Sequence, residues 1–140
     1  MHQSFLDCHQ DFAEFHGVLD IKTLGGAGFA SQRTVGDDRE WDLSKYAGIT
    51  ITIVNADDKR YTLILKDALL PRDPDTGRDQ ATISWEYDFK VESTVSSSTR
   101  DDHVFVAWDS FKPTYRGREK TGAKPIDLKH VKRVSIMNRR

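Results

Sequence analysis

The feature that most constrains the fold is a strict alternation of apolar and polar side chains over residues 83–91. Apolar residues stand at every second position from Ile83 to Val91, and polar residues fill the positions between them. A period of two is typical of a β-strand with one packed face and one solvated face. The pattern therefore predicts a half-buried strand with Trp85 and Tyr87 on its packed side.

A second alternating run lies at residues 49–53, where isoleucine alternates with threonine, and a third lies at residues 61–65. β-Branched and aromatic residues favour strands, and the polar residues 55–59 between the two runs are typical of a turn. We interpret these two runs as a β-hairpin.

Short strand candidates with turn-rich joints continue along the whole chain, which predicts an all-β sandwich. Pro113 is expected to end one of these strands, because proline cannot donate a hydrogen bond to a sheet. For residues 5–15 a short helix is an alternative to a strand. Apolar residues fall there at roughly helical spacing, at Phe5, Cys8, Phe12 and Phe15. The remaining expectations are strands at 15–21, 29–35, 104–108 and 131–137, single helical turns at 44–46 and 127–130, and loops at 71–79 and 92–102.

The 140 residues suffice for one domain, and a net charge of −1 gives no bulk preference for nucleic acid. The charge is unevenly distributed, however, because residues 101–140 hold ten Lys and Arg against five Asp and Glu. Such a bias indicates either a solvated face or a docking surface for an acidic partner.

Cys8 is the only cysteine, so an internal disulfide is impossible and a reducing compartment is natural. No run approaches the roughly 18 apolar residues of a membrane span, and we predict no membrane insertion. The first twenty residues contain four acids and no Lys or Arg, which is not the composition of a mitochondrial transit peptide. A cytoplasmic location is therefore one interpretation of the sequence.

The chain shows no nucleophile–base motif and no phosphate-binding glycine loop, so we predict a protein that is not an enzyme and has no cofactor. The glycines of residues 25–28 lead into a strand-like segment, which favours a tight turn over a nucleotide cradle. We predict that two groups of potential metal ligands hold no metal, because neither has the spacing of a closed site. They are Cys8, His9 and His16, and the acidic turns at residues 57–58 and 101–103.

The segment after Pro113 has the composition of a protein-interaction site. Tyr115, Arg116, Arg118 and Lys120 surround a flexible Gly117, and tyrosine with arginine is typical of interface hot spots. We predict that these four residues bind a partner. The alternative is that Arg116 and Arg118 pair with Glu119 or Asp109 and only stiffen the loop.

Four short motifs, in order, resemble the complex I intermediate-associated protein 30 family. They are residues 26–31 (GAGFAS), 42–48 (DLSKYAG), 109–118 (DSFKPTYRGR) and 125–128 (PIDL), and the resemblance covers about residues 15–137. It implies a jelly-roll-like β-sandwich of the galactose-binding-domain-like type. It further implies a non-catalytic assembly factor, or chaperone, that binds immature subunits of mitochondrial respiratory complex I or other assembly factors.

The fold suggests a second function, a carbohydrate-binding module, in which Trp85, Tyr87, Trp108 and Tyr115 would be the candidates for stacking on a sugar. The resemblance divides the chain into an extension (1–14), a sandwich (15–137) and a basic tail (138–140). The family pattern continues beyond the equivalent of Met137, so we expect the last strand to be missing. An open sheet edge would then allow self-association.

Overall fold

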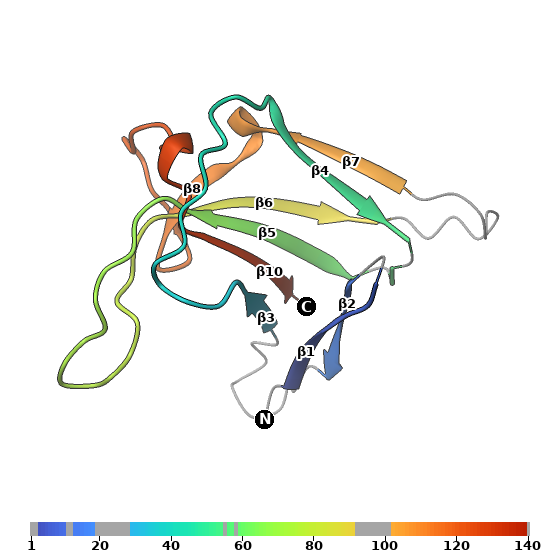
Figure 1. Ribbon diagram of the computed structural model, residues 1–140, viewed down its shortest axis with the longest axis horizontal. Helices are drawn as coiled ribbons and strands as arrows, with labels where there is room; N and C mark the ends of the chain where they lie inside the picture. The colour runs from blue at the N-terminus through green and yellow to red at the C-terminus, as the bar shows by residue number, and fades with distance from the viewer. Residues whose placement is uncertain are drawn as a thin grey trace.

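The computed structural model describes residues 3–10, 13–18, 29–54, 56–57, 59–91 and 102–139. The regular secondary structure of this part is almost entirely β, with antiparallel strand pairs and two short 3₁₀ helices. Figure 1 shows a large sheet with a two-stranded ribbon packed over it. The prediction of an all-β sandwich is confirmed.

The larger sheet has six strands in the order β3-β10-β5-β6-β8-β9. Residues 83–91, 29–35 and 131–137, which the sequence predicted as strands, all contribute to it. Their strands are shorter or shifted by one or two residues, as is usual at strand ends. The six strands are β3 (Phe29–Arg33), β5 (Arg60–Lys66), β6 (Ser84–Lys90), β8 (Lys112–Tyr115), β9 (Arg118–Glu119) and β10 (Arg133–Arg139).

The second layer consists of β4 (Gly48–Ile53) and β7 (Asp102–Ala107), which pair with each other. The predicted hairpin between residues 49–53 and 61–65 is therefore wrong, because β5 pairs with β6 and β10 instead. Both runs do form strands. Alternation determines which face of a strand is buried, but it does not identify the partner strand, and here the intervening turn carries the chain from one layer to the other.

The N-terminal segment forms a hairpin of β1 (Gln3–Cys8) and β2 (Ala13–Val18), so the helical alternative for residues 5–15 is wrong. Leu6 faces Phe15 across the pair, and the rings of Phe5 and His16 stack with centroids 5.3 Å apart. Cross-strand contacts of this kind stabilise a hairpin without requiring helical periodicity. Of the strand expected at residues 15–21, the first part lies in β2, and residues 19–21 lie outside the described part.

The strand predicted at residues 104–108 is β7, which ends at Ala107, before the chain reaches Pro113. A 3₁₀ helix, η1 (Trp108–Ser110), follows β7, and Pro113 lies inside β8 opposite Trp85. The expectation that Pro113 ends the strand is wrong, because the 3₁₀ turn has already changed the chain direction. A second 3₁₀ helix, η2 (Leu128–His130), confirms the helical turn predicted at residues 127–130.

The core lies between the two layers. Trp85 is 7% exposed, and Leu65, Val106 and Val131 are almost completely buried. Trp41, Ile49, Ile51, Tyr87 and other half-buried apolar residues pack around this cluster. The packed face predicted for the strand at residues 83–91 is thus confirmed.

β10 lies inside the large sheet, with β3 on one side and β5 on the other. Among the described residues, the outer strands of that sheet are β3 and β9. The last described strand is therefore hydrogen-bonded along both edges. Self-association through an open edge elsewhere stays a prediction.

A long connection joins β5 to β6 and projects from one end of the sheet (Figure 1). Within it, Gly77 N donates to Asp73 O at 2.8 Å and Asp73 N donates to Arg78 O at 2.9 Å. This confirms the loop at residues 71–79. The loop expected at 92–102 lies outside the described part except for Asp102, which belongs to β7. In the described part, we find no helix of the length and apolar character that crossing a bilayer requires.

Candidate functional site in the β8–β9 hairpin

The predicted interaction loop is a tight two-residue hairpin rather than a flexible segment. Tyr115 pairs with Arg118, while Arg116 and Gly117 form the turn with φ angles of 51° and 79°. Positive φ at both central residues is the pattern of a type I′ turn, whose twist matches that of the flanking strands. Lys120 N donates to Pro113 O at 3.0 Å and closes the base of the hairpin.

The four predicted site residues all lie on the surface of this hairpin. Tyr115 is 39% exposed, and Arg116, Arg118 and Lys120 are exposed as well. The guanidinium carbon of Arg116 lies 5.6 Å from the centroid of the Tyr115 ring. An exposed cation–π contact of this kind contributes about 0.5–1 kcal/mol, enough to orient both groups without burying either.

The alternative role of the arginines, pairing with nearby acids, finds no support in the described part of the chain. There, no ion pair joins Arg116 or Arg118 to Glu119 or Asp109. Backbone pairing holds the hairpin instead, with Glu119 opposite Thr114. The two guanidinium groups therefore remain accessible to a carboxylate on another molecule.

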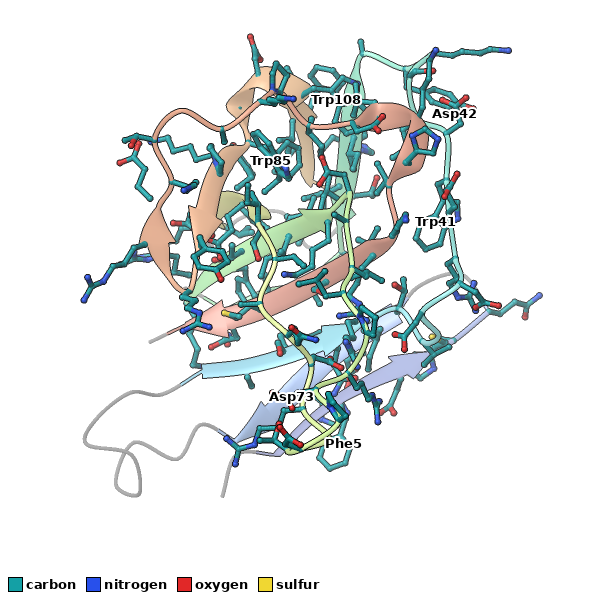
Figure 2. All side chains as sticks on the ribbon, turned by 90° about the vertical axis from the view of Figure 1, so that its left-hand side faces the viewer. Phe5, Trp41, Asp42, Asp73, Trp85 and Trp108 are labelled. Carbon is teal, nitrogen blue, oxygen red and sulfur yellow. The ribbon has the colours of Figure 1, made fainter. Side chains whose placement is uncertain are left out.

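The aromatic residues considered for sugar stacking are not assembled into an exposed platform. Trp85 and Tyr87 belong to the core, and Trp108 stacks on Phe111 with centroids 6.2 Å apart. Trp108 Nε1 also donates to Tyr46 O at 2.6 Å. Both tryptophans, Trp85 and Trp108, are labelled in Figure 2, which views the molecule from the side where β8 lies. Of the four aromatic candidates, only Tyr115 is exposed.

Of the potential metal ligands near the N-terminus, His16 lies beside two carboxylates on the surface. His16 Nε2 lies 2.7 Å from Asp7 Oδ2 and 3.8 Å from Glu14 Oε1, and all three side chains are exposed. Cys8, His9 and His16, which we predicted to hold no metal, do not form one group of potential ligands in the described residues. Exposed groups of this kind are common on protein surfaces without a bound ion.

The acidic turn residues have structural hydrogen-bonding roles where they are described. Asp57 accepts hydrogen bonds from Lys59 N at 3.1 Å, Lys59 Nζ at 2.8 Å and the Tyr61 hydroxyl at 2.6 Å. Desolvation raises the pKa of Asp57, but the hydrogen bonds from Lys59 and Tyr61 outweigh it, so the pKa is lowered. Asp58 and Asp101 lie outside the described residues. His103 Nδ1 is 3.1 Å from Thr52 Oγ1.

His130 at the end of η2 offers a direct test of the local electrostatics. Its Nδ1 lies 2.8 Å from Asp127 Oδ2, and its Nε2 lies 3.7 Å from Glu40 Oε1. The hydrogen bond that the protonated imidazole donates to Asp127 raises the pKa of His130 above 6.5, and the same bond lowers the pKa of Asp127. Because protonated His130 is favoured in the folded state, its contribution to stability is fully present below pH 6.5. That contribution is lost as the pH rises through the folded-state pKa.

We expect an NMR titration to show the His130 ring titrating above the usual histidine range. Asp127→Asn should move its pKa back toward 6.5, whereas Glu40→Gln should have a smaller effect because that contact is longer. An unchanged His130 pKa in Asp127→Asn would contradict the assignment of Asp127 as the main cause.

One cluster of charged residues could not be recognised from the sequence. β10 pairs with β5 so that Arg133 lies opposite Lys66, and Asp79 of the long connection lies 3.7 Å from Arg133. These residues are far apart in the sequence and form no motif. Only the strand pairing brings them together.

Comparison with known proteins agrees with the fold. The model of the family described as complex I intermediate-associated protein 30 matches residues 1–140, which is wider than the segment that carried the resemblance. An uncharacterised protein of Schizosaccharomyces pombe is 43% identical over 127 residues, which are 91% of this chain and 55% of that protein. The chain thus spans about half the length of the curated relative it matches. Because the family model covers the whole sequence, the chain belongs to the complex I intermediate-associated protein 30 family.

Proposed function

We propose that this protein is a non-catalytic assembly factor that binds protein partners during the building of mitochondrial respiratory complex I. The family to which the chain belongs is the observation that carries the proposal. Its partners would be immature complex I subunits or other assembly factors, and its location would be mitochondrial. The mechanism is binding without turnover.

The β8–β9 hairpin is the docking element in this proposal. It places one aromatic ring and two guanidinium groups at the tip of an edge hairpin, with the exposed Lys120 following at its base. Tyrosine and arginine dominate interface hot spots, and the arginine fork binds carboxylates through two parallel hydrogen bonds. An acidic surface on the partner is the matching chemistry.

The backbone of the hairpin is held in one conformation before a partner arrives. The type I′ turn and the hydrogen bond from Lys120 N to Pro113 O restrict the loop. A preorganised loop loses less conformational entropy on binding than a flexible one. The Arg116 backbone, however, adopts a left-handed conformation that asparagine and glycine tolerate better.

This backbone preference allows a test that removes charge without damaging the turn. The variant Arg116→Asn with Arg118→Gln should lose most partner binding, about tenfold or more if each arginine makes one charge-assisted contact. Its melting temperature should stay equal to wild type or rise slightly. Affinity capture from solubilised mitochondria, with detection of complex I subunits, measures the binding.

The matched control is Arg60→Gln with Lys90→Gln. These two exposed cations face each other at the opposite end of the same sheet, so this double variant makes the same change in net charge. It should bind as wild type does. Equal losses in both double variants would show that only bulk charge matters. Capture of partners that include no complex I subunit would overturn the complex I part of the proposal.

A further inference from the structure

A cavity of about 260 Å³ lies beside the large sheet, between the β5–β6 connection, the start of β10 and the segment after β3. Its size suits a small ligand or a single inserted side chain. The polar groups around it come mainly from Asp37, Lys66, Asp79, Thr82 and Arg133, and the leucines 69 and 70 form an apolar wall.

Arg133 is the most deeply buried charge at this cavity, with a side chain only 9% exposed. A guanidinium group has five N–H donors. Within the described residues it makes one hydrogen bond, from Nη2 to Asp37 Oδ1 at 2.9 Å. Its Nε is buried without a partner, and its Nη1 lies 3.7 Å from Asp79 Oδ2, beyond hydrogen-bond distance. The group is therefore under-satisfied, which is costly for a buried charge.

Lys66 adds a second cation directly across the strand pair. It lies opposite Arg133 in the register of β5 and β10, an arrangement that like charges normally disfavour. Its Nζ donates to Thr82 Oγ1 at 2.9 Å and to Thr82 O at 3.2 Å, which leaves its third N–H without a partner in the described part. Desolvation and then the charge of Arg133 lower the pKa of Lys66.

The two carboxylates of the cavity are only partly available to these two cations. Asp79 is shared by Arg33 at 2.8 Å, Arg72 at 3.5 Å and Arg133 at 3.7 Å. Asp37 contacts Arg133 but is 63% exposed. The cavity lining thus holds two cations and two carboxylates, but in the described part of the chain no carboxylate lies within ion-pair distance of Lys66, and only Asp37 lies within hydrogen-bond distance of Arg133.

We propose that this cavity binds an oxyanion, a carboxylate or a phosphate group, between Lys66 and Arg133. The oxyanion would accept the remaining N–H of Lys66 and the outer donors of Arg133, and it would separate two cations that now face each other. The leucine wall would contact an apolar portion of the ligand next to the anionic group. This inference concerns residues other than those of the β8–β9 hairpin and does not depend on the proposed function.

The test uses the purified chain, with thermal unfolding recorded at constant ionic strength while chloride is replaced by inorganic phosphate or by acetate. A ligand that binds only the folded state raises the melting temperature in a saturable way. We expect such a rise for wild type with at least one of the two probes. Phosphate as the better probe would indicate a phosphorylated ligand, and acetate would indicate a carboxylate; either result supports the site.

Lys66→Gln is the informative variant, because glutamine can still donate to Thr82 while the charge is removed. It should weaken the binding of the probe about tenfold or more, the usual loss when one charge-assisted hydrogen bond is deleted. The control is Lys90→Gln, at the far end of β6, which should bind as wild type does. Arg133→Gln should also lose binding if it folds. Undiminished probe binding in Lys66→Gln, or no saturable effect in wild type, would overturn the proposal.

Discussion

Replacing Trp85 with alanine is expected to destabilise the protein by about 3–5 kcal/mol, the usual cost of deleting a large aromatic side chain from a core. Trp85 is 7% exposed and lies in the cluster with Leu63, Leu65 and Phe111. Chemical unfolding followed by circular dichroism measures the change, and a loss below about 1 kcal/mol would contradict the core position.

Trp85→Phe is the matched variant. The indole Nε1 of Trp85 is buried and has no hydrogen-bond partner in the described part of the chain. Phenylalanine keeps an aromatic ring and removes this unsatisfied donor, whose burial costs about 1–3 kcal/mol. We therefore expect Trp85→Phe to be much less destabilising than Trp85→Ala. Equal losses in the two variants would show that the indole makes a contact that benzene cannot replace.

Gly48→Ala is expected to destabilise the protein strongly, although alanine adds only one methyl group. A Cβ at this position would lie 2.2 Å from the Val106 carbonyl oxygen and 2.8 Å from the Phe105 ring. The oxygen belongs to the backbone of β7, so β4 and β7 would have to separate. Overpacking costs about 1–3 kcal/mol, and we expect a value at the upper end because backbone must move.

The control for Gly48→Ala is Thr50→Ala on the same strand. Thr50 is exposed, and its replacement should change the unfolding free energy by only about 0.5 kcal/mol or less. Urea unfolding of both variants gives the comparison. If Gly48→Ala were as mild as Thr50→Ala, the close approach of the two strands at Gly48 would be wrong.

The strands themselves could be predicted from the sequence because alternation is a local property of the chain. A residue in an extended segment points to the face opposite its neighbours regardless of what pairs with it. For this reason the strand at residues 83–91, the inward direction of Trp85 and the two runs at 49–53 and 61–65 were all predictable. The order of the four motifs likewise identified the family that the comparison then showed.

The partners of these strands could not be predicted in the same way. β4 pairs with β7, about fifty residues later, instead of with the nearby β5, and the N-terminal residues form a hairpin instead of a helix. A turn sequence allows a chain reversal, but packing of both layers around the core decides whether the two strands join one sheet or separate sheets. The preference of one segment for helix or strand is likewise small compared with the cross-strand contacts it makes in the fold.

The same distinction holds for the two candidate sites. The composition of the β8–β9 hairpin, with its tyrosine and basic residues, is visible in the sequence, although its tight type I′ geometry is not. The cavity with Lys66 and Arg133 could not be anticipated at all, because neither residue stands in a motif and each is unremarkable in its own strand. Register alone places these two charges opposite each other, and register follows from the burial of whole strand faces across the sheet.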